Sequence, residues 1–342
     1  MLVSEFDYDL PEELIAQEPL PQRDHSRLMV LHRGTRTWEH RHFYDLPAYL
    51  APGDTLVMNE TRVFPARLLG RRTGTGGRVE LLLLRPVGEG HWEGLVRPSR
   101  RLHAGDRLEF GNGRLSAVIE ADLGAGRRIV RLEADGPEVM PAIEEVGKVP
   151  LPPYIKKPLA NPDRYQTVYA HTTGSVAAPT AGLHFTPSLL RQIAEQGVRE
   201  VYVTLHVGIG TFRPVRVTTV EQHVMDQEYY SVSAAAAEEI NETKRRGGRV
   251  VAVGTTVCRT LESAAGEDGL VEPGERFTGL FIHPGYRWRM VDALITNFHL
   301  PRSTLLMLVS SFAGREFVLA AYREAIKERY RFYSFGDAML IL

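Results

Sequence analysis

Two patterns of hydrophobic and polar residues divide the chain. Between about residues 62 and 136, short stretches of alternating apolar and polar residues, such as RVELLLLRP and RRIVRLE, are separated by glycine-rich turns such as GTGG, VGEG and LGAG. This pattern is typical of antiparallel strands joined by hairpins. It predicts a small barrel or sandwich.

From about Val149 onwards, helical and extended stretches alternate. TPSLLRQIAEQG offers Thr186 as a helix cap and Pro187 in the first turn, and VYVTLHV after it is typical of a buried strand. SAAAAEEINETKRRGG, which begins at Ser233, repeats the pattern and precedes the apolar RVVAVG. Such alternation predicts helices that cover a largely parallel sheet.

The first sixty residues do not follow the spacing of the barrel, and LVMNET resembles another buried strand. We therefore expect an α/β fold. Residues 1–61 and 137–342 would form a layered α/β/α domain with a largely parallel or mixed sheet, and residues 62–136 an inserted antiparallel β-barrel domain. The proline-rich VPLPPYIKKP would be the return linker.

The composition, 43 % hydrophobic and 24 % charged residues, is that of a globular protein. No window reaches 18 uninterrupted apolar residues, so we expect no membrane span. The single cysteine, Cys258, excludes an internal disulfide and a multi-cysteine metal site, and it fits a reducing compartment. We expect a cytoplasmic protein in which Cys258 is a small core side chain.

Basic charge is concentrated in the barrel. The formal net charge is −1, yet residues 62–135 carry fourteen arginines against nine Asp or Glu residues. The surplus fits either a solvated surface or a nucleic-acid partner.

Four segments join a predicted strand to the next element: APTAGLHF, LHVGIGTF, VGTTVCRTLE and ITNFHLPRST. Strand ends in open α/β sheets border ligand crevices. Thr255 and Thr256 would begin a helix whose free amides favour an anion, although simple capping is the alternative. Gly208 and Gly210 would let the backbone approach a planar ligand, but their G-x-G lacks the third glycine of a dinucleotide site.

Three histidines, His184, His206 and His299, lie at these segments. A single one would most simply be structural, but three together favour a shared acid–base site because histidine titrates near neutrality. Their spacing matches no metal motif, so we expect no metal. In ITNFHLPRST, Asn297 and its neighbours would face the crevice, and Ser303 or Thr304 would cap the following buried helix.

Several long segments carry a family resemblance. FDYDLPEELIAQEPLPQRDHSRL, GDTLVMNETRVFPARL, VAAPTAGLHF, VTLHVGIGTFRPV, VAVGTTVCRTLES, DALITNFHLPRSTLLMLVS and YRFYSFGDAML resemble the S-adenosylmethionine:tRNA ribosyltransferase-isomerase family of queuosine biosynthesis. The resemblance covers nearly the whole chain and is weakest across the barrel. It implies an α/β layered domain with an inserted barrel.

The resemblance also implies an activity. The ribosyl part of S-adenosylmethionine is transferred to 7-aminomethyl-7-deazaguanine at the wobble position of tRNA, which gives epoxyqueuosine and releases adenine and methionine. S-adenosylmethionine is thus a consumed substrate, and no cofactor is expected. The expected partners are tRNA carrying 7-aminomethyl-7-deazaguanine and S-adenosylmethionine, with no membrane and a monomeric chain.

The resemblance assigns candidate roles. A general base would be His299 or His184, without a choice between them, and Asp337 is a third catalytic candidate that could balance the sulfonium charge. The candidates for substrate binding are Arg62, Thr180, Ala181, Gly182, His206, Gly208, Gly210, Thr255, Thr256, Arg259 and Asn297. Arg62 could equally form a structural salt bridge. The candidates for tRNA binding are Arg71, Arg72, Arg100 and Arg101.

Two alternatives remain open. An S-adenosylmethionine-dependent RNA methyltransferase would need a glycine-rich loop after its first strand and an acidic residue after its second, and the chain has no clear version of that pair. A non-catalytic tRNA-binding protein would not need the histidines at the strand ends. His42 and His283 match no family position, and we assign them no role.

Overall fold

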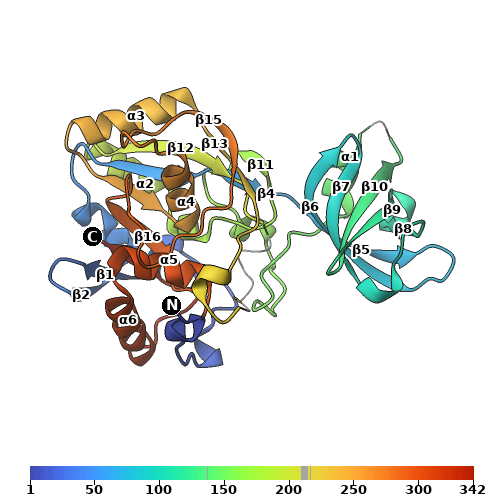
Figure 1. Ribbon diagram of the computed structural model, residues 1–342, viewed down its shortest axis with the longest axis horizontal. Helices are drawn as coiled ribbons and strands as arrows, with labels where there is room; N and C mark the ends of the chain where they lie inside the picture. The colour runs from blue at the N-terminus through green and yellow to red at the C-terminus, as the bar shows by residue number, and fades with distance from the viewer. Residues whose placement is uncertain (137, 209–214, 216) are drawn as a thin grey trace. The chain divides into compact units, whose positions relative to one another are not determined.

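The computed structural model describes residues 1–136, 138–208, 215 and 217–342, and it divides into two compact units (Figure 1). The large unit comprises Met1–Arg62, Pro153–Thr172 and Ala178–Leu342, and the small unit Val63–Pro152 and Thr173–Ala177. The small unit runs past residue 136 because α1 (Val139–Val146) packs on two of its strands and Lys148 pairs with Arg67.

A nine-stranded mixed sheet forms the centre of the large unit. Its strands, in spatial order, are β15 (Gly274–Thr278), β13 (Glu228–Val232), β12 (Arg199–Leu205), β3 (Thr55–Asn59), β14 (Val250–Val253), β16 (Ala293–Asn297), β17 (Ala338–Ile341), β1 (Arg27–His32) and β2 (Thr37–His42). The four neighbours β12, β3, β14 and β16 are parallel. Every residue of β3, β14 and β16 is buried, as expected for parallel strands covered on both faces.

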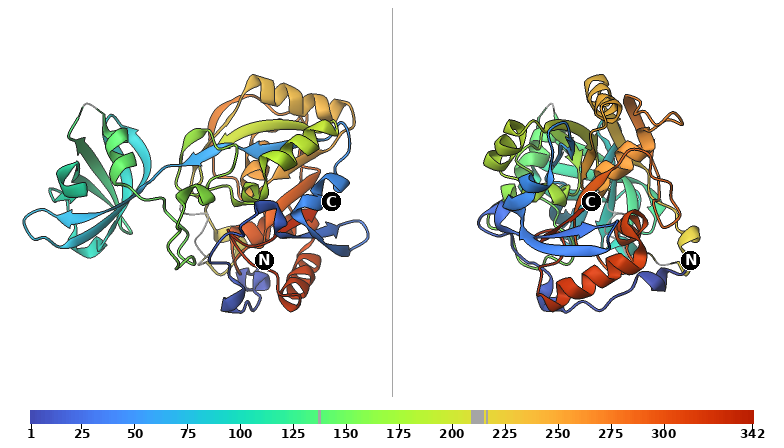
Figure 2. Two further views of the ribbon diagram at one scale, coloured as in Figure 1. Left: turned by 180° about the vertical axis from the view of Figure 1, so that it is seen from behind. Right: turned by 90° about the vertical axis from the view of Figure 1, so that its left-hand side faces the viewer.

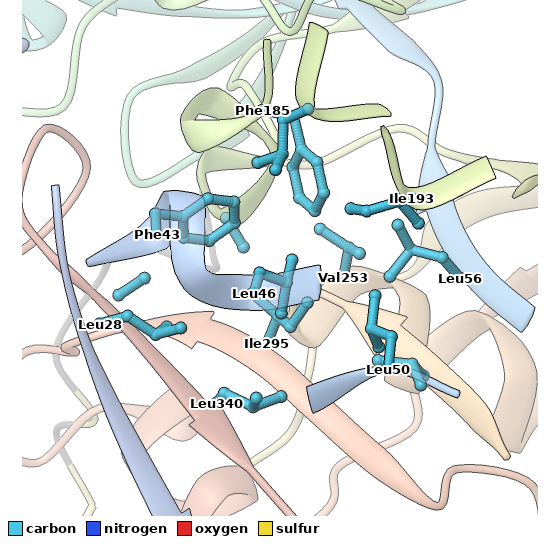
Figure 3. Close-up of a cluster of buried hydrophobic side chains, with 14 of the residues drawn as sticks. Leu28, Phe43, Leu46, Leu50, Leu56, Phe185, Ile193, Val253, Ile295 and Leu340 are labelled. Carbon is cyan, nitrogen blue, oxygen red and sulfur yellow. The ribbon is translucent and has the colours of Figure 1, made fainter. Parts of the chain in front are cut away.

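Helices cover both faces of this sheet. On one face, η4 (Phe43–Tyr49), η8 (Thr180–His184) and α2 (Pro187–Glu195) contribute to a cluster of buried hydrophobic side chains that includes Phe43, Phe185 and Ile193 (Figure 3). The other face is covered by α3 (Ala234–Arg245) and α4 (Thr255–Ala264). The expected layered α/β class is therefore confirmed.

Two more helices, α5 (Thr304–Ala313) and α6 (Arg315–Lys327), complete the layer on the face covered by α3 and α4. Helix α5 packs against α4, and α6 lies beside α5 (Figure 2). No single helix in the described ranges is both long and apolar enough to cross a membrane. Only α5 and α6 taken together satisfy that test of length and composition, and they are bent by 112° at the break between them.

Side-chain caps begin three of these helices. The hydroxyl oxygens of Thr186, Ser233 and Ser303 accept hydrogen bonds from backbone N–H groups in the first turns of α2, α3 and α5. These bonds satisfy donors that a helix start would otherwise leave free. The sequence predicted the caps at Thr186 and Ser233, and of its two candidates for α5 the structure selects Ser303.

The small unit contains a closed antiparallel barrel, as predicted. Its strands are β10 (Arg127–Ala134), β7 (His91–Arg97), β6 (Arg78–Gly88), β5 (Arg67–Arg72), β8 (Arg107–Phe110) and β9 (Leu115–Gly124). Alternate residues such as Leu81 and Leu83 are fully buried. Gly70 is required where β5 meets β8, because an added Cβ would lie 2.1 Å from the Glu109 carbonyl oxygen.

Two short strands, β4 (Thr61–Val63) and β11 (Thr172–Ser175), form a separate sheet. The thiol of Cys258 on α4 is fully buried, and burial raises its pKa well above the ordinary value. Cys258 is thus the core side chain expected from the sequence, with no reactive thiolate.

Candidate active site

A pocket opens at the carboxyl ends of the parallel strands of the large unit. It includes about 540 Å³ of space, part of it open to solvent. Three of the four predicted segments contribute residues 178–181, 254–256 and 296–300, and Val207 comes from the fourth. The remaining lining residues are Tyr154, Leu305, Tyr333 and Ser334.

Asn297, the last residue of β16, is held in one orientation by its neighbours. Thr180 donates its hydroxyl to Asn297 Oδ1 at 2.9 Å, and Asn297 Nδ2 lies 3.5 Å from the carbonyl oxygen of Asp337 and 3.1 Å from His184 Nε2. A carbonyl oxygen only accepts, so the amide nitrogen must face it. His184 Nε2 therefore accepts a hydrogen bond from Asn297.

This orientation fixes the tautomer of His184. Since Nε2 accepts, the ring proton is on Nδ1, which donates to Ser26 Oγ at 2.7 Å. The ring is buried and stacks on Phe43 with centroids 4.9 Å apart. Burial, followed by the charges of Arg23 and Arg331, lowers its pKa to about 3. Both ring nitrogens of His184 are used within the protein, and the ring does not line the pocket. His184 thus positions Asn297.

His299 is the histidine that lines the pocket. Its Nε2 bonds Thr296 Oγ1 at 2.8 Å, and burial lowers the pKa of the ring to about 3, so it is neutral near pH 7. Two tyrosines hold its backbone: the N–H donates to the Tyr322 hydroxyl at 2.9 Å, and the Tyr8 hydroxyl donates to the carbonyl oxygen. The pocket therefore presents a rigidly held, neutral imidazole.

The start of α4 forms another wall. Gly254 precedes the helix with φ of 96°, a left-handed conformation that favours glycine, and it supplies no side-chain cap. Among the described residues no side chain caps the first amides, at Thr255 and Thr256, and the helix dipole favours a negative group there. Buried Asn59 donates to Thr256 Oγ1 at 3.3 Å and to the Leu205 carbonyl at 3.0 Å, which ties this helix start to two strands.

Aromatic rings at the pocket were missed from the sequence. Tyr154 and Tyr333 pack with ring centroids 4.8 Å apart, and the Tyr154 hydroxyl bonds Ser334 Oγ at 2.7 Å. Such rings can stack on a nucleobase. The motif YRFYSFGDAM placed Tyr333 near the predicted Asp337, but no local signal identified Tyr322 in the middle of α6.

Two of the predicted residues are bonded within the protein, outside the lining. Asp337 accepts hydrogen bonds from the backbone N–H groups of Arg27 and Arg331, at 2.8 and 2.7 Å, and burial raises its pKa. Arg259 forms a buried ion pair with Glu228 and donates to the Leu280 carbonyl at 3.0 Å. The structure does not bring either side chain to the pocket.

The residues around LHVGIGTF are similarly engaged. His206 Nδ1 bonds Thr61 Oγ1 at 2.9 Å, its ring stacks on Tyr229, and burial lowers its pKa. Gly208 N–H donates to Glu228 Oε1 at 2.8 Å. Neither His206 nor Gly208 lines the pocket, and Gly210 lies outside the described residues.

Of the remaining substrate candidates, Thr180 and Ala181 line the pocket and Gly182 does not. Gly182 shapes η8 instead, because an added Cβ would lie 2.1 Å from the Tyr169 hydroxyl oxygen. Arg62 is exposed, and no ion pair is found for it among the described residues. The salt bridge considered as its alternative role is therefore not seen.

The four candidate arginines of the barrel have different surroundings within the small unit. Arg71 is exposed and lies opposite Arg78 on the next strand, while Arg72 pairs with Asp106 at 2.5 Å. Arg100 and Arg101 are exposed in the short turn η5 (Ser99–Arg101).

Known proteins resemble this chain over its whole length. The family profile described as "Queuosine biosynthesis protein" matches residues 3–341. Proteins named S-adenosylmethionine:tRNA ribosyltransferase-isomerase from Moorella thermoacetica and Pelotomaculum thermopropionicum are 58 % and 57 % identical, over the full length of both chains. The crystal structure of S-adenosylmethionine tRNA ribosyltransferase from Thermotoga maritima is 44 % identical, with a TM-score of 0.57, covering 99 % of this chain and 100 % of that one. The chain therefore belongs to the queuosine biosynthesis protein family.

Proposed function

We propose that this protein is an S-adenosylmethionine:tRNA ribosyltransferase-isomerase. It transfers and isomerises the ribosyl moiety of S-adenosylmethionine onto 7-aminomethyl-7-deazaguanine at the tRNA wobble position, which gives epoxyqueuosine and releases adenine and methionine. One observation carries the assignment of the site: segments that follow different strands meet in a single pocket with a neutral imidazole, an open helix start and aromatic rings. Full-length similarity to enzymes of this name supports the activity.

His299 is the proposed general base. The sulfonium centre of S-adenosylmethionine acidifies the neighbouring ribose carbon, and a neutral imidazole is in the correct state to accept that proton. Burial disfavours the imidazolium. When the proton moves, however, the ribose carbon becomes a carbanion that balances the sulfonium as a neutral ylide while the imidazole becomes positive, so the net charge of the pocket stays constant. The bound substrate thus offsets the penalty that lowers the pKa of His299 in the free protein.

The other walls orient the substrate. The amides at the start of α4 would hold the methionine carboxylate, as helix starts do for anions. Thr180 gives its proton to Asn297, so its oxygen keeps lone pairs that accept from an amino or hydroxyl group of the substrate. Tyr154 and Tyr333 would stack on a base plane.

We further propose that the protein acts as a monomer in the cytoplasm, on tRNA carrying 7-aminomethyl-7-deazaguanine. S-adenosylmethionine would be consumed as a substrate, without a cofactor or metal. In the described part of the chain, no group of three or more His, Cys, Asp or Glu side chains is placed to hold a metal ion.

A mass balance tests the reaction. With S-adenosylmethionine and the modified tRNA, adenine and methionine should be released in equal amounts, and His299→Ala should lower the rate about 10²- to 10⁴-fold. His42→Ala, at an exposed histidine of the same unit, is the matched control and should leave the rate unchanged. Release of S-adenosylhomocysteine would instead indicate a methyltransferase. Binding of tRNA without any adenine release would indicate a non-catalytic binding protein.

Charge reversal tests the barrel. Replacing Arg71, Arg72, Arg100 and Arg101 by Glu should raise the KM for tRNA and leave the KM for S-adenosylmethionine unchanged, because phosphate contacts depend on positive charge. If both values stay the same, the barrel arginines do not contact RNA.

A further inference from the structure

A second, smaller pocket lies on the Ser26 side of His184. It includes about 290 Å³ of space, part of it open to solvent, and its polar lining consists of Arg23, Arg164, Ser26, His184 and Ser334. The other lining residues are proline, leucine, phenylalanine and glycine, so none of the described acidic residues lines the space. We call it the arginine pocket. Ser334 also lines the candidate active site, so the two pockets are neighbours.

The two arginines lack acidic partners. Arg23 donates to the carbonyl oxygens of Leu183 and Asp163, each at 3.1 Å, and Arg164 donates to that of Leu20 at 2.5 Å. Among the described residues, the side-chain hydrogen bonds of both guanidinium groups go to backbone carbonyl oxygens and none goes to a carboxylate. A guanidinium has five N–H donors, so several remain available on each.

Positive charge is crowded around this space. Burial and then the charge of Arg164 lower the pKa of Arg23. Arg331 acts on the same region, since its charge contributes to the lowered pKa of His184, although Asp337 and Glu18 partly balance it; its Nη1 is buried without a hydrogen-bond partner among the described residues. Like charges held close together in a partly buried site repel one another, and a bound anion relieves that repulsion.

The hydrogen bonds of His184 add a donor aimed at the same space. Ser26 is buried and accepts from His184 Nδ1–H, so its own hydroxyl proton is left to donate elsewhere. The described residues offer it no acceptor. The hydrogen bonds therefore form a chain in which each side chain donates to the next, from Thr180 to Asn297, to His184 and to Ser26. An anion in the arginine pocket would be the final acceptor of this chain.

We infer that the arginine pocket binds a phosphodiester group of the tRNA, next to the nucleotide that reacts in the neighbouring pocket. The inference rests on the proposed function, which makes tRNA the substrate. Two guanidinium forks suit the oxygens of a phosphate, and every nucleotide within a tRNA strand is flanked by phosphodiesters. The methionine carboxylate already has a place at the start of α4.

Binding measurements test this inference without any turnover. The probe is an unmodified tRNA transcript, followed by fluorescence anisotropy at several NaCl concentrations. Arg23→Gln and Arg164→Gln should each weaken binding about tenfold, and the slope of log K against log[salt] should become shallower by about 0.7 to 0.9 for each phosphate that the protein no longer neutralises. The Kd for S-adenosylmethionine, measured by calorimetry, should not change.

Arg191→Gln is the matched control, since Arg191 is an exposed arginine of α2 without an ion pair among the described residues. Arg164→Lys keeps the positive charge but loses the paired N–H donors of the guanidinium, so this variant should bind tRNA more tightly than the Arg164→Gln variant does. Both Arg164 variants should melt like the parent, which separates an effect on binding from an effect on folding.

Three outcomes would overturn the inference: unchanged tRNA binding, an effect no larger than that of Arg191→Gln, or weaker binding of S-adenosylmethionine in place of tRNA. The last outcome would assign the pocket to the methionine carboxylate. A failure of the proposed function looks different, because the parent protein would then release no adenine while its arginine-dependent tRNA binding persisted.

Discussion

Asn297→Asp is a nearly isosteric change that tests the donor directions around the candidate active site. Asn297 is 3 % exposed, and its amide nitrogen faces two acceptors, His184 Nε2 and the Asp337 carbonyl oxygen. A carboxylate has no proton for either of them. The new side chain must bind a proton itself, or His184 must become an imidazolium that donates to it.

The magnitude follows from the hydrogen bonds. Leaving a buried acceptor unsatisfied costs about 1 to 3 kcal/mol, so the two acceptors together predict a destabilisation of roughly 2 to 5 kcal/mol near pH 8, with the 3.5 Å bond near the lower end. Each kcal/mol lowers the Tm of a large domain by about 2 to 4 °C. In the variant a carboxylate at position 297 raises the pKa of His184 above its present value of about 3. The imidazolium then stabilises the folded state below that pKa, so the destabilisation should shrink as the pH falls.

Thermal unfolding of the variant between pH 5 and 8 and ¹⁵N NMR of the histidine rings measure these effects, and the rate of adenine release should fall with stability. Asn112→Asp, at an exposed asparagine of the barrel, is the control and should change neither. The reasoning is refuted if NMR places the proton of His184 on Nε2 in the parent protein, or if the Asn297→Asp variant melts like the parent at pH 8.

Three further changes test other parts of the large unit. Tyr322→Phe leaves the His299 N–H without its acceptor, so it should lower the free energy of unfolding by about 1 to 3 kcal/mol and lower kcat more than KM. An unchanged kcat and Tm would show that the Tyr322 hydroxyl does not hold the His299 backbone in place. The pKa values of His184 and His299 are about 3, against 6.5 unfolded, so the free energy of unfolding should fall as the pH drops below about 6.5. The slope is up to about 1.4 kcal/mol per pH unit for each histidine, and urea titrations that give a flat profile from pH 7 to 4 would exclude it. Gly182→Ala should destabilise the protein by about 1 to 3 kcal/mol, because its Cβ meets the Tyr169 hydroxyl, and adding Tyr169→Phe should restore part of the Tm.

Local sequence signals predicted the fold class because they reflect local physics. Helix caps such as Thr186 and Ser233 satisfy donors within their own first turn, and hydrophobic periodicity reports which face of an element is buried. Strand β17 shows the limit. Its four apolar residues insert between β16 and β1 and run antiparallel to β16, a pairing that depends in part on a segment hundreds of residues away.

The candidate site was predicted as a set of segments, but not residue by residue. The rule that ligands bind at strand ends indicated which segments would converge. It could not separate His184 from His299, since the contacts that decide which ring lines the candidate active site, such as the bond from the His184 ring to Ser26, join residues distant in sequence. Arg259 lies one helical turn after Thr255, which directs it to the buried Glu228.

The position of β17 inside the sheet, between β16 and β1, bears on how the protein is made. The nine-stranded sheet cannot be completed until residue 341 has left the ribosome. Residues 63–152, which contain the barrel, emerge much earlier and can begin to fold during translation. Because β17 separates β16 from β1, a nonsense mutation that removes only residues 338–342 should abolish the active site almost as completely as a deletion of half the chain.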